Sequence, residues 1–129
     1  MAVTHSTAAR DAATDAVTAL IGASGNLVFR LAGNVGAPGT AVATLPLSAD
    51  AFADSSSGTA TANAITSDTN ATGNASAVAT ATLQTSGGTV VIHCAVTASS
   101  GDIDMTNGLT VAAADTVSCS SLTYTALSA

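Results

Sequence analysis

A chain of 129 residues with two arginines, no lysine and eight acidic residues, all aspartate, carries a net charge of −6. Binding to a nucleic-acid backbone depends on clustered lysine and arginine, so this composition excludes nucleic acid as a ligand and argues equally against an anionic membrane surface. The absence of lysine also excludes Schiff-base catalysis and any covalent cross-link through a lysine amine of this chain.

One domain spanning residues 1–129 is the simplest organisation for this length, which allows one hydrophobic core but not two. The core is thin, because alanine supplies 30 of the apolar residues while Leu, Ile, Val and Phe together supply 26. A buried large aliphatic side chain contributes about 1.5–3 kcal/mol and an alanine far less, so the isolated chain should be marginally stable. We therefore expect it to oligomerise or to dock on another protein.

The amino-terminal segment MAVTHSTAARDAATDAVTALIG carries two aspartates and no uninterrupted apolar run, so it predicts neither a secretory signal nor a membrane span. No other segment approaches the length of a span. The sequence thus predicts a soluble protein with no visible export route. In such a chain Cys94 and Cys119 are more often free and buried than paired, and whether they form a disulfide stays open.

A helix is predicted over residues 6–22, where apolar residues recur at three- and four-residue intervals. Ser6 or Thr7 can cap its start, and Gly22 or Gly25 can end it. The residues on its apolar face are Ala9, Ala13, Ala16, Val17, Leu20 and Ile21. The remaining elements, between residues 26 and 129, are predicted as strands.

The first of these is NLVFRLAG, whose alternation of side chains is typical of a half-buried strand. Residues 33–39, GNVGAPG, are predicted as a loop. An extended stretch follows from Val42 to Leu47, in which Pro46 indicates a sheet edge or a strand end. A short turn then places Phe52 in the core.

Residues 58–83 are almost entirely small and contain no aromatic side chain. Small residues alternate with period two in GTATANAIT and NASAVATATL, which indicates strands, and SDTNATG between them has turn chemistry. The stretch is therefore predicted as a hairpin-like unit with a mobile tip at 66–74. A disordered tract is the alternative, although it would carry higher net charge, more proline and no period.

The strongest hairpin signal is in TATLQTSGGTVVIHCAVTA, where Ser86-Gly87-Gly88 joins strands 78–85 and 89–97 and the Cys94 thiol points inward. DIDMT and GLTVAA are predicted as two short strands that flank a tight turn at Asn107-Gly108. The last predicted strand lies in TVSCSSLTYTAL. One amino-terminal helix followed by about eight short strands is typical of a jelly-roll-like antiparallel β-sandwich, a mainly β fold.

No catalytic, cofactor-binding or metal site can be assembled from the sequence. A hydrolase triad would need His5 or His93, and GASGN at residues 22–26 departs from the G-x-S-x-G elbow in its last residue and follows a helix, not a strand. Asp102 and Asp104 share a strand face, but two carboxylates lack the further oxygen ligands of a calcium loop. We therefore predict that the protein is not an enzyme and binds no cofactor.

The segments STAARDAATDAVTALIGASGNLVFRLAG, VATLPLSADAF and GDIDMTNGLTVAAADTVSCSSLTYTAL together resemble small virion structural proteins of tailed bacteriophages. Members of that group run from a short helix into a small β-sandwich and end in a similar tail of a turn, a strand and S-L-T-x-T. Within the group, the resemblance is to capsid decoration proteins, also called cement proteins.

The resemblance implies a module that binds the outside of an icosahedral phage head, after assembly in the host cytoplasm, and ties neighbouring capsomers together. Its partner would be the major capsid protein, bound by the helix face and strand edges, with this chain as a homo-oligomer, a dimer or trimer, at symmetry axes. Arg10 and Arg30 are candidate capsid or inter-subunit contacts through an ion pair. The alternative for each is a solvated charge or a local pair with Asp11.

The alternative function is a tail-associated or receptor-binding β-sandwich module. In that case exposed loops such as 33–39 and 66–74 would touch a host glycan or protein. This alternative predicts few copies at the tail tip, whereas a decoration protein is spread in many copies over the head.

Overall fold

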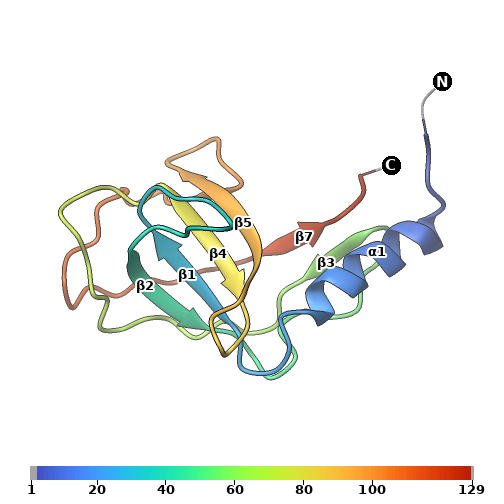
Figure 1. The fold of residues 1–129 in the computed structure, drawn as a ribbon, viewed down its shortest axis with the longest axis horizontal. Coiled ribbons are helices and arrows are strands. Elements are labelled where there is room, and N and C mark those ends of the chain that lie inside the picture. Colours follow the sequence, from blue (N-terminus) through green and yellow to red (C-terminus); the bar gives the residue numbers. More distant parts are fainter. Residues whose placement is uncertain (1–2, 129) are drawn as a thin grey trace.

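The computed structural model describes residues 3–128 and shows a mainly β fold with one amino-terminal helix, as the sequence predicts. Helix α1 spans Thr7–Ala19. The strands are β1 (Asn26–Arg30), β2 (Ala41–Pro46), β3 (Thr59–Thr61), β4 (Thr80–Gln84), β5 (Val90–Thr97), β6 (Ile103–Asp104) and β7 (Thr123–Thr125). In Figure 1, α1 lies at one end of the molecule with β3 and β7, and β1, β2, β4 and β5 lie together at the other.

Five strands form the main sheet in the order β2-β1-β4-β5-β6, and β3 and β7 form a second, smaller sheet. The strands pair antiparallel except for β5 and β6, which are parallel, so the predicted antiparallel order is wrong at that pair. The arrangement is sandwich-like, because the small sheet and several irregular segments contribute buried residues to the same core as the main sheet. A jelly-roll topology stays a prediction.

Short-range sequence signals place several elements correctly. The Ser6 hydroxyl accepts a hydrogen bond from the Ala9 N–H and caps α1, and Gly22, just beyond the helix end, has a φ of +70°. β4 and β5 form the predicted hairpin, with Gly88 at a φ of +94° in the turn. Pro46 ends β2, which lies at an edge of the main sheet.

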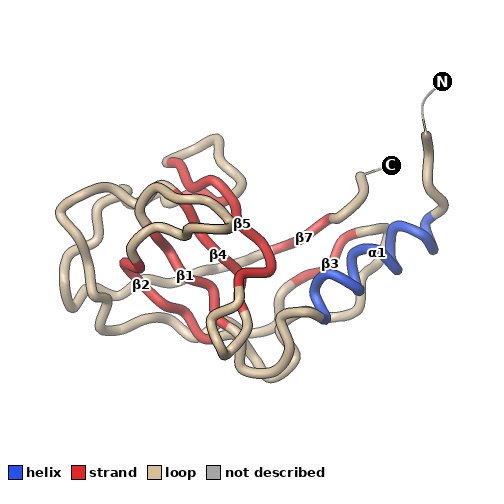
Figure 2. The backbone as a smooth tube through the Cα atoms, viewed as in Figure 1, coloured by secondary structure: helices blue, strands red, loops and turns tan. Residues whose placement is uncertain are grey.

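The stretch 58–83 does not form the predicted hairpin. Its strand segments are β3, which pairs with β7, and β4, which pairs with β1 and β5. Residues 62–79 between them are irregular apart from isolated bridges (Figure 2). Two small-residue faces gain little by packing on each other, so each alternating run pairs with a strand that carries larger side chains.

Residues 66–74, predicted as a mobile tip, instead pack against the carboxy-terminal third of the chain. Asp68 exchanges two backbone hydrogen bonds with Val117, of 2.9 and 2.8 Å. Ala71 is buried in the core. GLTVAA, also predicted as a strand, is irregular, and its carbonyl groups accept single hydrogen bonds from the 62–79 segment. Isolated long-range hydrogen bonds thus replace a regular ladder in this part of the fold.

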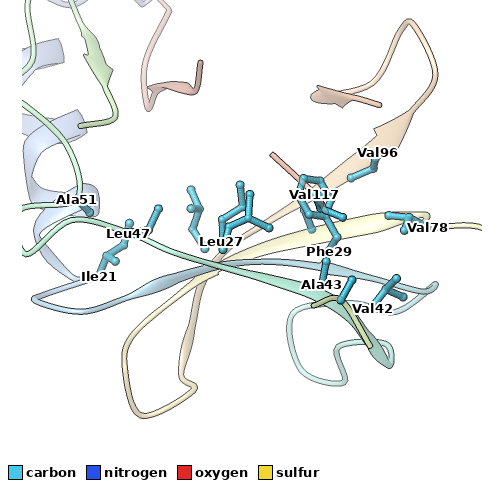
Figure 3. Close-up of a cluster of buried hydrophobic side chains, with 14 of the residues drawn as sticks. Ile21, Leu27, Phe29, Val42, Ala43, Leu47, Ala51, Val78, Val96 and Val117 are labelled. Atoms are coloured by element: carbon cyan, nitrogen blue, oxygen red, sulfur yellow. The ribbon is translucent and has the colours of Figure 1, made fainter. Parts of the chain in front are cut away.

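The hydrophobic core lies on one face of the main sheet. Leu27 in β1 stands opposite Leu45 in β2 and Leu83 in β4, and all three are buried. Phe29, two residues further along β1, is buried on the same face, next to Val117 (Figure 3). Large aliphatic and aromatic side chains thus form the centre of this core, and buried alanines such as Ala43 and Ala81 fill the positions beside them.

Candidate interaction surfaces

Helix α1 docks on the rest of the chain through carboxylates on its polar side. Asp11 Oδ1 accepts a 2.6 Å hydrogen bond from the Gly58 N–H, and Asp15 Oδ1 accepts a 2.9 Å bond from the Ser55 N–H. The Ser55 hydroxyl in turn donates to the Asp11 carbonyl at 3.0 Å. Residues one helical turn apart lie on one side of a helix, so these bonds fix one side of α1 against the loop that precedes β3.

Thr14 lies on the same side of α1 and is fully buried. Its hydroxyl donates a 2.6 Å hydrogen bond to the Gly58 carbonyl and accepts a 3.1 Å bond from the Ala126 N–H. Gly58 has a φ of +86°, and a Cβ added there would lie 3.1 Å from the Arg10 Cβ, so glycine permits this close approach. A single hydroxyl thus joins the helix to two segments that are distant in the sequence.

The opposite side of α1, here called the outer face, is apolar and exposed. The outer face consists of Ala8, Ala9, Ala12, Ala16 and Ala19 of the helix and of Leu20 at its C-cap. Leu20 is 66% exposed, whereas Ile21, on the predicted apolar face with it, is buried. Ala13 and Val17, also on the predicted apolar face, are half-buried, so about half of that face packs on the chain and the rest stays exposed. An exposed apolar surface of this kind is a feature of protein interaction sites.

Arg10 lies near the docking side of α1. Its Nη1 donates a 3.3 Å hydrogen bond to the Ser128 carbonyl. Its Nε is buried and has no hydrogen-bond partner within residues 3–128. An inter-chain or capsid contact at Arg10 stays a prediction.

Arg30 projects from the face of the main sheet that is opposite the core. Its Nε donates to Thr82 Oγ1 at 3.0 Å, its Nη2 to Gln84 Oε1 at 2.8 Å and its Nη1 to the Gly39 carbonyl at 2.9 Å. All three guanidinium nitrogens therefore bind uncharged acceptors of this chain, and they tie the 33–39 loop to the sheet. The ion pair predicted for Arg30 would have to be made in addition to these bonds.

Both cysteines are free and partly buried. Burial raises the pKa of the Cys94 thiol to about 11, with a further rise from the Asp102 carboxylate, while a hydrogen bond to the Ala81 carbonyl lowers it. Burial also raises the pKa of the Cys119 thiol, against the effect of its hydrogen bond to the Ser121 carbonyl. Neither thiol is activated as a nucleophile, because the thiolate is the reactive form.

We expect the raised pKa of Cys94 to make the protein less stable in alkali. The thiol ionises near its ordinary value of 9.0 in the unfolded chain and near 11 in the folded chain, so its contribution to stability is complete below pH 9 and is lost as the pH rises through 11. The free energy of unfolding, measured with urea below pH 9 and again above pH 11, should fall less with pH for Cys94→Ala than for the wild type. Parallel pH profiles would contradict this expectation.

The two carboxylates considered for metal binding hold backbone groups of this chain in place. Asp102 Oδ2 accepts a 2.9 Å hydrogen bond from the Ala95 N–H, and Asp104 Oδ1 accepts one of 2.9 Å from the Gly101 N–H. His93 lies partly buried on β5, and its Nε2 is buried with no hydrogen-bond partner within residues 3–128. Within residues 3–128, no group of three or more His, Cys, Asp or Glu side chains could hold a metal ion.

Sequence patterns give no signal for a cleft in the carboxy-terminal third, with a volume of about 690 Å³. One wall is the segment 102–108, which contains β6, and the other is the segment 115–123. Phe29, Val111 and Val117 line it from the core side. The walls come from distant, mostly irregular segments, so no periodicity marks them.

Comparison with known protein families, curated proteins and solved structures gives no match to this chain. In the part of the chain that the structure describes, no helix has the length and hydropathy needed to span a membrane.

Proposed function

We propose that this chain is a structural protein of a virion, a capsid decoration or cement protein that binds the outer surface of a phage head and stabilises contacts between capsomers. The resemblance of its sequence to such proteins supports the proposal. The structural observation that carries it is the outer face of α1, which is apolar and exposed while the polar side of the helix is used for docking. This orientation leaves an apolar surface for another polypeptide.

The partner proposed for the outer face is the major capsid protein. A helix of 13 residues is roughly 20 Å long and presents a strip roughly 10 Å wide. That strip is far smaller than the roughly 800 Å² per partner of a stable free complex, and two copies of a chain with a charge of −6 repel each other. On an assembled shell, by contrast, weak contacts to neighbouring subunits add up through multivalency. Dimers or trimers of this chain would then form at symmetry axes of the shell.

Leu20→Gln tests this contact, and Val35→Gln in the 33–39 loop is its control. Both side chains are more than half exposed, so neither change should reduce the stability of the isolated chain by more than about 0.5 kcal/mol. Burial of a leucine contributes about 1.5–3 kcal/mol to a contact, so Leu20→Gln should bind shells at least about tenfold more weakly. Mixing each variant with shells stripped of this protein and counting bound copies on a stained gel measures the effect.

The two variants also separate the proposed function from the alternative. Loss of shell binding with Leu20→Gln alone supports a shell contact through α1. Unchanged binding of Leu20→Gln, or an equal loss with Val35→Gln, would contradict it. A tail-associated or receptor-binding module would not bind stripped shells, and changes in its 33–39 loop would alter host attachment instead.

A further inference from the structure

The cleft between the segments 102–108 and 115–123 has an apolar base and partly exposed apolar walls. Phe29, Val111 and Val117 are buried in the hydrophobic core and also line the cleft. The partly buried apolar side chains on its walls are Ile103, Met105, Cys119 and Leu122. Its volume of about 690 Å³ lies in the range of clefts that enclose ligands. Apolar side chains of a binding partner would therefore find a preformed surface here.

One wall of the cleft is an open edge of the main sheet. β6 is the last strand in the order β2-β1-β4-β5-β6 and pairs with β5 alone. The backbone groups on its outer side are the kind of edge to which another extended chain can add. On the facing wall, Ser118, Ser120 and Ser121 are exposed.

Three of the eight aspartates line this cleft, Asp102 and Asp104 on one wall and Asp115 on the other. Backbone hydrogen bonds hold them in place, from Gly101 to Asp104 Oδ1 and from Ala112 to Asp115 Oδ2, each at 2.9 Å. Neither arginine of the chain lines the cleft. The negative charge of both walls therefore favours a partner with positive side chains.

We propose that this cleft binds an extended segment of another polypeptide, which adds as a strand to the outer edge of β6, inserts apolar side chains toward Phe29 and Val117, and places lysine or arginine beside the carboxylates. A second copy of this chain does not fit, because it has no lysine and both of its arginines bind acceptors of their own chain: Arg30 binds three, and Arg10, whose Nε is buried, binds the Ser128 carbonyl. The inference does not rest on the proposed virion function, because the cleft selects its partner by backbone pairing, apolar side chains and charge.

The first test uses the full-length protein and capped peptides of about six residues, the usual length of a strand. One peptide alternates valine with lysine, a second replaces lysine with glutamate, and a third is the lysine peptide N-methylated at every second residue. The lysine peptide should bind when it is titrated into ¹⁵N-labelled protein. The amide chemical shifts that change should be concentrated in residues 102–108 and 118–123. The glutamate and N-methylated peptides should bind at least about tenfold more weakly, since they lose the charge contacts or the backbone hydrogen bonds.

The second test removes charge from both walls. The double variant Asp104→Asn with Asp115→Asn keeps an oxygen that accepts each backbone hydrogen bond. Its affinity for the lysine peptide should be about threefold to tenfold lower than that of the wild type. The matched control is Asp50→Asn with Asp54→Asn, which changes the net charge equally at exposed positions outside the cleft and should change affinity by less than about twofold. Equal binding of all three peptides, equal effects of the two double variants, or shifts confined to other surfaces would overturn the proposal.

Discussion

Replacing Leu27 with alanine is expected to lower the free energy of unfolding by about 2–5 kcal/mol, the range for large-to-small substitutions in a close-packed core. Leu27 is 0% exposed and stands between Leu45 and Leu83 in the centre of the main sheet. Because domains are stable by only about 5–15 kcal/mol, the loss should remove much of the stability. Urea unfolding followed by circular dichroism measures it.

Leu20→Ala is the matched control for Leu27→Ala, since it deletes the same atoms from a side chain that is 66% exposed. We expect a change within about 0.5 kcal/mol, as for surface substitutions generally. Similar losses in the two variants would mean that the outer face of α1 is covered within the isolated chain. Leu20→Ala should also weaken binding to shells. A variant that keeps its stability but binds shells less shows that Leu20 acts in attachment and not in folding.

Replacing Thr14 with valine is expected to cost about 2–4 kcal/mol, because it leaves a buried carbonyl and a partly buried N–H without a partner. Valine has nearly the same shape as threonine but lacks the hydroxyl that binds the Gly58 carbonyl and the Ala126 N–H. Helix α1 would lose its link to both the loop before β3 and the carboxy-terminal segment. Chemical denaturation gives the total loss, and hydrogen exchange should show faster exchange in α1 than in β1.

Thr18→Val controls for the loss of a buried hydroxyl on the same side of the helix. The Thr18 hydroxyl donates to the Asp15 carbonyl in its own helix at 3.3 Å, so its removal should cost less than about 1 kcal/mol. Thr14→Ser, which keeps the hydroxyl, should retain most of the stability. If Thr14→Val and Thr18→Val had equal effects, the proposed role of Thr14 in docking the helix would be wrong.

Local signals predicted the elements that short-range chemistry determines. A serine hydroxyl at position 6 satisfies an amide at the start of a helix, glycine at position 88 permits a turn with positive φ, and Pro46 cannot donate to a further strand. These features depend on a few neighbouring residues, so the sequence alone reveals them.

Pairing over long distances was not predictable in the same way. The alternating run at 59–61 pairs with Thr123–Thr125, and the run at 80–84 pairs with Asn26–Arg30 and Val90–Thr97. Alternation of alanine and threonine gives the period of a strand but no preference among partners, because small side chains discriminate little between neighbours. The parallel pairing of β6 likewise has no local signature.

The orientation of α1 shows why periodicity alone did not locate the candidate surface. Helical spacing identifies an apolar face, but the side that docks depends on what the rest of the chain offers. Here the loop before β3 and the carboxy-terminal segment present backbone N–H and carbonyl groups to Asp11, Thr14 and Asp15. These polar side chains therefore face the chain together with Val17 and Ile21, and the alanines and Leu20 of the outer face are left exposed.

Density for the purified virus particle at a resolution that traces α1 is the most direct measurement of this surface and its partner. We expect many copies of the chain spread over the outside of the head, each with Ala12, Ala16 and Leu20 of the outer face in contact with the major capsid protein. Copies confined to the tail, or copies on the head with the outer face of α1 open to solvent, would contradict the proposed function and its contact.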